Sequence, residues 1–169
     1  MITMKKKIIK SSAGFTMTEL LVVMFIISLL STSVLISFRN NQKSYGLNQS
    51  AQQLISNLRK AQNMAMNKVN INGYDSYGIC AETNNNYYII YADDNSNNTY
   101  EPSDVIIETI NLLNNVKINN TLDVFFESPD PKTYINGSDI IGLSGSIILE
   151  IDGAFKTITI TTAGLIQGN

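Results

Sequence analysis

The feature that most constrains this chain is an uncharged apolar run near its N-terminus, residues 20–38. The run contains no proline and no glycine, and its only polar residues are Ser and Thr, whose hydroxyls can bond back to helix carbonyls. Its nineteen residues, at ~1.5 Å each, would form a helix of roughly 28 Å, about the hydrocarbon thickness of a bilayer. Because only a helix satisfies every backbone polar group in lipid, the run predicts a membrane-spanning helix.

The segment before the run predicts its orientation. Residues 1–14 contain no acid and four lysines: Lys5, Lys6, Lys7 and Lys10. Such a flank is expected on the cytoplasmic side of the membrane, with the rest of the chain outside. A secretory signal has its small-residue cleavage site after the apolar run. Here the small pair Ala13-Gly14 precedes the run, and nothing after residue 38 resembles such a site.

One acidic residue, Glu19, stands at the start of the apolar run. A carboxylate at the centre of a spanning helix costs roughly 2.5–3.5 kcal/mol on insertion scales, and less near the interface. Even near the interface, a lone carboxylate invites a functional explanation.

Residues 14–21, Gly-Phe-Thr-Met-Thr-Glu-Leu-Leu, follow the lysine-rich leader, and the whole arrangement resembles the class III signal of type IV pilins and type II secretion pseudopilins. In that family a membrane-embedded prepilin peptidase cuts after the Gly and methylates the new N-terminal Phe. The resemblance implies cleavage between Gly14 and Phe15, N-methylation of Phe15, and an assembly role for Glu19 as the fifth residue of the mature chain. The alternative is an unprocessed single-pass anchor with Glu19 in the headgroup region.

The assembly role that the resemblance implies for Glu19 can be explained by a charge pair between neighbouring subunits. After cleavage, the Phe15 amine of one subunit is expected to meet the Glu19 carboxylate of a neighbour in a bundle of staggered helices. Two unit charges ~4 Å apart attract by about 4 kcal/mol at an effective dielectric near 20. That attraction would oppose the cost of burying the charges and set the axial register between subunits.

A second apolar pattern follows the run, with residues repeating at steps of three and four. These residues are Leu47, Ala51, Leu54, Ile55, Leu58, Ala61 and Ala65. The spacing predicts an amphipathic helix continuous with the first, from about Thr16 to about Lys68, with one stripe on a globular domain. Gly46 is the expected weak point, where the helix kinks or loosens.

Two further segments resemble this family. Residues 51–61, Ala-Gln-Gln-Leu-Ile-Ser-Asn-Leu-Arg-Lys-Ala, are similar to the helix of H-type minor pseudopilins, and residues 156–166 are similar to the family's closing strand and turn. Many major pilins carry a proline within the anchor, whereas here Pro102 is the first proline. These features favour a minor pilin or pseudopilin.

After residue 70 the chain changes to short β-rich pieces between Asn, Gly, Asp and Ser clusters. Expected strands are residues 77–81, 87–91, 105–110, 116–118, 122–127, 146–151 and 155–162, with 165–167 as a possible extension. Asp152-Gly153 predicts a hairpin turn, and Ser128–Ser138 a surface loop. The predicted fold is α+β and pilin-like, with the long helix packed on one face of an antiparallel sheet.

The expected domain organisation has four parts. Residues 1–14 are the leader, 15–38 the transmembrane and assembly helix, 39–70 its amphipathic continuation, and 71–169 the globular β domain. Removing the four leader lysines leaves eight basic and fourteen acidic residues, a net charge of −6. Lys156 is the last basic residue, so the basic tail with which some minor pilins bind DNA is missing, and no nucleic-acid partner is expected.

The composition argues against an enzyme. The chain has no histidine, which removes the commonest general base and metal ligand, and its carboxylates form no evident catalytic pair. Asp93 and Asp104 frame a segment similar to a calcium loop, but Asn98 replaces the required Gly. A solvated loop is therefore expected, and no metal or cofactor.

Cys80, the only cysteine, is expected to be a buried residue of a strand. The tyrosines are expected in core and cross-strand packing.

These observations together predict a structural minor subunit of a type IV pilus-like or type II secretion filament. The expected partners are the prepilin peptidase, other pilins or pseudopilins, the assembly platform and membrane lipid. The protein would wait in the cytoplasmic membrane with its β domain outside the cytoplasm, and then enter the filament. The alternative function is an unassembled, membrane-anchored β domain that binds a ligand.

Overall fold

A computed structural model describes residues 14–129 and 132–168, without the side chains of residues 36–40. The chain divides into two compact units, Met1–Asn40 and Asn41–Asn169. Within the described residues, one helix, α1 (Met17–Met66), precedes nine strands. The strands are β1 (Tyr77–Ala81), β2 (Tyr87–Ala92), β3 (Val105–Asn111), β4 (Lys117–Ile118), β5 (Leu122–Phe126), β6 (Thr133–Ile135), β7 (Ser144–Ile151), β8 (Ala154–Thr161) and β9 (Ile166–Gly168). This α+β, pilin-like arrangement confirms the predicted fold class.

The helix α1 is continuous through Gly46, so the kink or loosening predicted there is wrong. Gly46 is buried, and a Cβ atom at this position would lie 2.7 Å from the side-chain nitrogen of Asn114. The glycine therefore allows the loop between β3 and β4 to pack closely on the helix, and that packing offsets its poor helix propensity. At the C-terminus Lys68 has a φ of 49°, and the Val69 amide bonds the Met64 carbonyl at 2.9 Å, which closes the helix in a Schellman motif.

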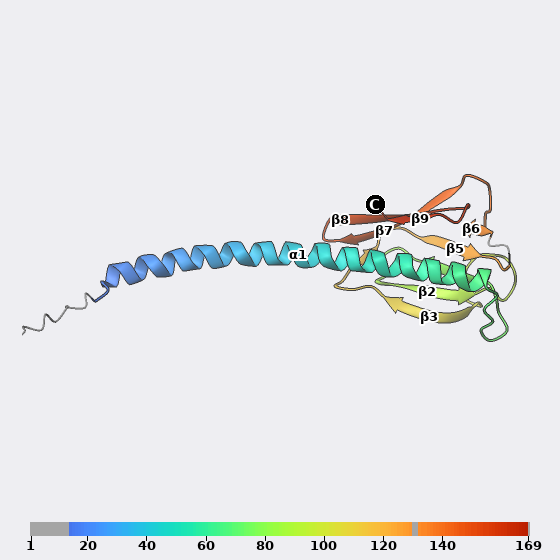
Figure 1. Ribbon diagram of the computed structural model, residues 1–169, viewed down its shortest axis with the longest axis horizontal. Coiled ribbons are helices and arrows are strands. Elements are labelled where there is room, and N and C mark those ends of the chain that lie inside the picture. Colours follow the sequence, from blue (N-terminus) through green and yellow to red (C-terminus); the bar gives the residue numbers. More distant parts are fainter. Residues whose placement is uncertain (1–13, 130–131, 169) are drawn as a thin grey trace, which may run out of the picture. The chain divides into compact units, whose positions relative to one another are not determined.

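The predicted apolar stripe of the helix is confirmed, because all seven of its residues are buried. They pack with residues of both sheets in one core cluster that includes Ile79, Ile90 and Leu149. In Figure 1 the second half of α1 runs alongside the strands, with β8 and β9 on one side and β2 and β3 on the other. The helix thus provides the apolar surface that both sheets share.

The strands form two antiparallel sheets, so the prediction of one sheet is wrong. The first sheet has the order β3-β2-β1-β5-β6 and the second the order β4-β7-β8-β9. The segment Ser128–Ser138, predicted as a loop, contains β6, which pairs with β5 through Val124 and Ile135. Two sheets form because β7 pairs locally with β8 through a tight hairpin, whereas β5 returns to pair with β1. The Asp152-Gly153 turn of that hairpin is confirmed, with positive φ at both residues.

The five-stranded sheet is covered on both faces, whereas only one buried face was predicted. On the face away from α1, Cys80, Ile89, Tyr91 and Phe125 form a second buried cluster. The loop between β2 and β3 covers this cluster, since Tyr100 packs edge-on against Tyr91 with ring centroids 5.2 Å apart. Side chains of successive strand residues point to opposite faces, so Ile90 lies in the first cluster and Tyr91 in the second.

Candidate processing and assembly site

The Gly14-Phe15 bond, where cleavage is predicted, lies just before the helix. Gly14 and Phe15 have no regular secondary structure, and Phe15 is 83% exposed. A Cβ atom at Gly14 would meet nothing within 4 Å. Among the described residues, nothing covers this bond, so it is accessible to another protein. The lysines of the leader, residues 1–13, lie outside the described residues.

Thr16 caps the helix N-terminus. Its hydroxyl accepts a hydrogen bond from the Glu19 amide at 3.2 Å, and its carbonyl accepts one from the Leu20 amide at 3.2 Å. Thr16 and Glu19 thus occupy the first and last positions of the Thr-x-x-Glu capping-box pattern. The Thr-x-x-Glu spacing is present in the sequence itself, so this cap could have been predicted from residues 16–19 alone.

Glu19 lies in the first turn of α1 and is exposed. A negative charge is favourable there, because the unbonded amides at a helix start create a partial positive charge. The carboxylate therefore has a local role within its own helix. Because its side chain is exposed, it is also available to a group on another molecule.

Residues Met17–Leu35 of α1 are long and apolar enough to cross a membrane. The side chains of this segment are exposed in the structure. The hydroxyls of Ser28, Ser31 and Thr32 donate to the carbonyls four residues earlier, at 2.8, 2.8 and 2.9 Å. As predicted, these three hydroxyls in the apolar run bond back to carbonyls of their own helix, and the segment is compatible with a single-pass membrane anchor.

Cys80 and the acids of the calcium-like segment have roles in the fold rather than in a metal or reactive site. Cys80 is buried in β1 as predicted, and burial raises the pKa of its thiol to about 12. Asp93 accepts hydrogen bonds from the amides of Ser96 and Asn98 at 2.8 and 2.6 Å. Asp104 accepts one from the Glu101 amide at 2.7 Å, so both carboxylates of the calcium-like segment stabilise their own loop. Within residues 14–129 and 132–168, no group of three potential metal ligands comes together.

The tyrosines follow the predicted packing role in part. Tyr77, Tyr88 and Tyr91 are fully buried, which confirms the prediction for these three. The hydroxyl of Tyr91 donates to the Asp123 carboxylate at 2.9 Å, in the second cluster. Sequence reasoning missed Asp123, which is buried in β5 and also accepts a hydrogen bond from the Tyr100 amide at 3.0 Å. Its burial raises its pKa to about 6, against the lowering effect of these hydrogen bonds.

Comparison with known proteins identifies the N-terminal segment. Residues 9–35 match the family model of the prokaryotic N-terminal methylation motif, a range that includes Gly14, Phe15 and Glu19. No curated protein and no solved structure matches the chain. The match confirms the resemblance to the signal of type IV pilin-like proteins and pseudopilins, a structural rather than enzymatic class.

Proposed function

We propose that this protein is a structural subunit of a type IV pilus-like or type II secretion filament. A prepilin peptidase cleaves it between Gly14 and Phe15 and methylates the Phe15 amine. The observation that carries the proposal is the methylation motif at residues 9–35, which ends within an exposed helix able to span a membrane. The four expected parts, residues 1–14, 15–38, 39–70 and 71–169, then serve as leader, anchor, connecting helix and exposed domain.

Assembly is driven by transfer of the apolar anchor from lipid into a bundle of like helices, with the assembly platform in the membrane as a partner. Helix association in lipid depends on packing and on polar contacts between helices. The Glu19 carboxylate of one subunit pairs with the methylated Phe15 amine of its neighbour. The pair is supported by the position of Glu19 in the first turn of the helix, with its side chain exposed.

The proposal also covers the orientation of the chain in the membrane and the abundance of the subunit in the filament. The lysines of the leader hold the N-terminus on the cytoplasmic side of the membrane, and the β domain lies outside the cytoplasm. The similarity of residues 51–61 to the helix of H-type minor pseudopilins, with the similarity of residues 156–166 to the family's closing strand and turn, supports a less abundant subunit that primes, caps or decorates the filament.

Expression of the full-length chain with and without a prepilin peptidase and its assembly system tests the function. The proposal predicts a shortened protein in the sheared filament fraction only when the peptidase is present. A protein that keeps residues 1–14 and stays in the membrane under both conditions would support the anchored ligand-binding module instead.

A further inference from the structure

The strands at the edges of the two sheets differ greatly in length. Among the described residues, β6, β4 and β9 have three, two and three residues, whereas β3 has seven. A long edge strand presents a row of unpaired amides and carbonyls to other chains, and lysine or proline commonly protects such edges. β3 contains neither, and after a register shift beside Ile90 its ladder is regular over residues 108–111. It is therefore the edge of this domain best able to accept another strand.

The register of β3 shows which of its backbone groups face outward. The amide of Leu112, directly after β3, bonds the carbonyl of the residue before β2 at 2.7 Å. Because successive residues of an antiparallel strand direct their amides to alternate sides, the amides of Ile110 and Glu108 also face β2. Those of Thr109 and Asn111 point to the open side. In the described part of the chain, no other element bonds the backbone of these two residues.

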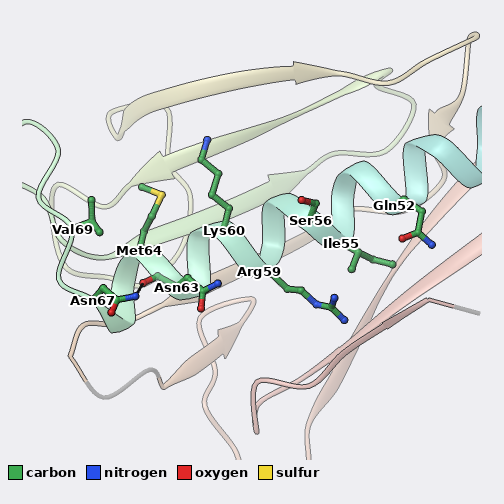
Figure 2. A pocket seen from close by; sticks show the side chains of 9 residues that line it. All are labelled: Gln52, Ile55, Ser56, Arg59, Lys60, Asn63, Met64, Asn67 and Val69. Atoms are coloured by element: carbon green, nitrogen blue, oxygen red, sulfur yellow. Dashed lines mark hydrogen bonds between the residues drawn. The ribbon is translucent and has the colours of Figure 1, made fainter.

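The only charged side chain of β3 is held on the α1 side of the sheet. Figure 2 shows Lys60 on α1 with its side chain pointing away from that of Arg59. The Lys60 amine forms an ion pair with Glu108 of β3 at 2.9 Å. The opposite face of β3 presents Ile106 and Thr109 and carries no charge. An incoming strand would therefore meet uncharged side chains of β3 on the face away from the helix.

A pocket of about 260 Å³ lies on this second face, beside the edge. Its lining includes Ile106 and Thr109 of β3, Ile89 of β2, and Glu82. The volume is below the ~300–1,000 Å³ typical of small-molecule sites, so the pocket suits a side chain of a peptide. Glu82 accepts a hydrogen bond from the Asn85 side chain at 3.1 Å, a neutral donor that does not cancel the carboxylate charge. A long basic side chain, with an apolar stem and a charged end, matches this lining.

The charge around the edge favours a different protein over a second copy of this chain. Residues 69–116, which include β3, contain seven acids and no base. Among the described residues, Glu108 alone of these acids has a basic ion-pair partner. Two copies that paired through β3 would bring these like charges together. The other edge strands of a second copy have three residues or fewer and offer little backbone to pair with.

We propose that the open edge of β3 binds an extended, basic segment of a different polypeptide, which adds a strand to the five-stranded sheet. The backbone groups of Thr109 and Asn111 bond this segment, and one of its Lys or Arg side chains enters the pocket toward Glu82. In such complexes the main-chain hydrogen bonds give affinity and the pocket gives specificity. The site goes beyond the proposed filament function, because it requires neither cleavage nor a neighbouring copy. It is compatible with a less abundant subunit.

Amide hydrogen exchange in the detergent-solubilised full-length protein tests the site. The probe is a capped peptide, Thr-Arg-Thr-Val-Thr-Arg-Thr-Val, which favours an extended conformation and places both arginines on one face. In the free protein, the amides of Thr109 and Asn111 should exchange quickly and those of Glu108 and Ile110 slowly. Saturating peptide should slow exchange at Thr109 and Asn111 about tenfold and leave the other two unchanged.

A matched peptide separates strand pairing from charge attraction. N-methylation of two adjacent amides keeps every side chain but prevents a complete ladder on either edge of the peptide, so this peptide should give no protection. Glu82→Gln should weaken binding of the unmodified peptide about threefold. Asp139→Asn removes an exposed acid outside the pocket and should leave binding unchanged. Unchanged binding to the Glu82→Gln protein would overturn the role of the pocket.

Three results at Thr109 and Asn111 would overturn the site: protection already present in the free protein, no protection with the peptide, or equal protection from both peptides. Protection that rises with protein concentration alone would assign the edge to a second copy and overturn the basic partner. None of these results depends on cleavage or assembly, so the proposed function would stand in each case.

Discussion

The backbone amide of Glu19 donates a hydrogen bond to the Thr16 hydroxyl at 3.2 Å, so the first acid of α1 is fixed to the residue that caps the helix. The positively charged amine that cleavage would create belongs to Phe15, one residue before this cap. Glu19 can therefore act in two ways, through the helix start of its own subunit and through the amine of a neighbour. The two roles are separable by substitution.

Thr16→Ala removes the cap and leaves the carboxylate. We expect it to cost about 1 kcal/mol of local helix stability and to leave filament incorporation nearly intact. Glu19→Gln keeps a polar side chain of the same size but removes the charge, and Glu19→Leu removes both. Both Glu19 variants should be cleaved normally and enter filaments poorly, as measured by the processed protein in sheared fractions. Normal incorporation of Glu19→Leu would refute the pairing of Glu19 with the Phe15 amine.

Asp123→Asn should change the pH dependence of stability. The pKa of Asp123 is raised to about 6 in the folded protein, mainly by burial, compared with ~3.9 for a free Asp. The fold thus favours the protonated acid, so this contribution to stability is present below pH ~4 and is lost as pH rises through about 6. Asn keeps an oxygen for the Tyr100 amide but does not titrate.

Thermal midpoints of the detergent-solubilised full-length protein measure this effect. Relative to Asp123→Asn, the wild type should lose stability between pH 4 and pH 7, by on the order of 3 kcal/mol at most. A difference between the two proteins that stays constant over this range would contradict the account of Asp123.

Gly46→Ala tests the reason for the glycine in α1. Helix propensity alone favours Ala by about 1 kcal/mol. The new Cβ would instead meet the Asn114 side chain at 2.7 Å, so we expect a lower thermal midpoint. Asn114→Gly should relieve the clash, because it removes the side chain that the new Cβ meets. Glycine should be tolerated at position 114, because the backbone there has a φ of 53°, which glycine adopts readily. A single Gly46→Ala protein that is more stable than the wild type would contradict this explanation.

Gly78→Ala tests the packing of the second cluster. Gly78 pairs with Tyr91 across β1 and β2, and an added Cβ would overlap the Tyr91 ring. Overpacking of this kind typically lowers the free energy of unfolding by about 1–3 kcal/mol in a well-packed core. Gly153→Ala is a useful comparison, because a Cβ at this turn glycine would meet nothing within 4 Å and any loss there reflects its φ of 81° alone. Equal thermal midpoints for Gly78→Ala and the wild type would contradict the close packing of Gly78 on Tyr91.

The parts of this fold that sequence could predict are those set by local patterns. The stripe from Leu47 to Ala65 follows the helical period, and Asp152-Gly153 is a turn signal that needs no tertiary contact. The cleavage signal is also local, which explains why the family model finds it at residues 9–35.

The parts that could not be predicted depend on contacts between distant segments. The segment of β6 follows two prolines and reads as a loop, yet Phe126 and Thr133 pair in the sheet. In β5, Asp123 alternates with apolar residues, a pattern that alone would predict a side chain facing solvent. It is buried only because the 93–104 loop covers that face, and nothing in the local sequence of β5 indicates this cover.

The most direct test of the account is the intact mass of the protein recovered from the filament fraction of cells that contain a prepilin peptidase. The account predicts a chain that begins at Phe15, shortened by fourteen residues and carrying one added methyl group on its N-terminal amine. A working protein that still carries Met1 or Lys5 would contradict it.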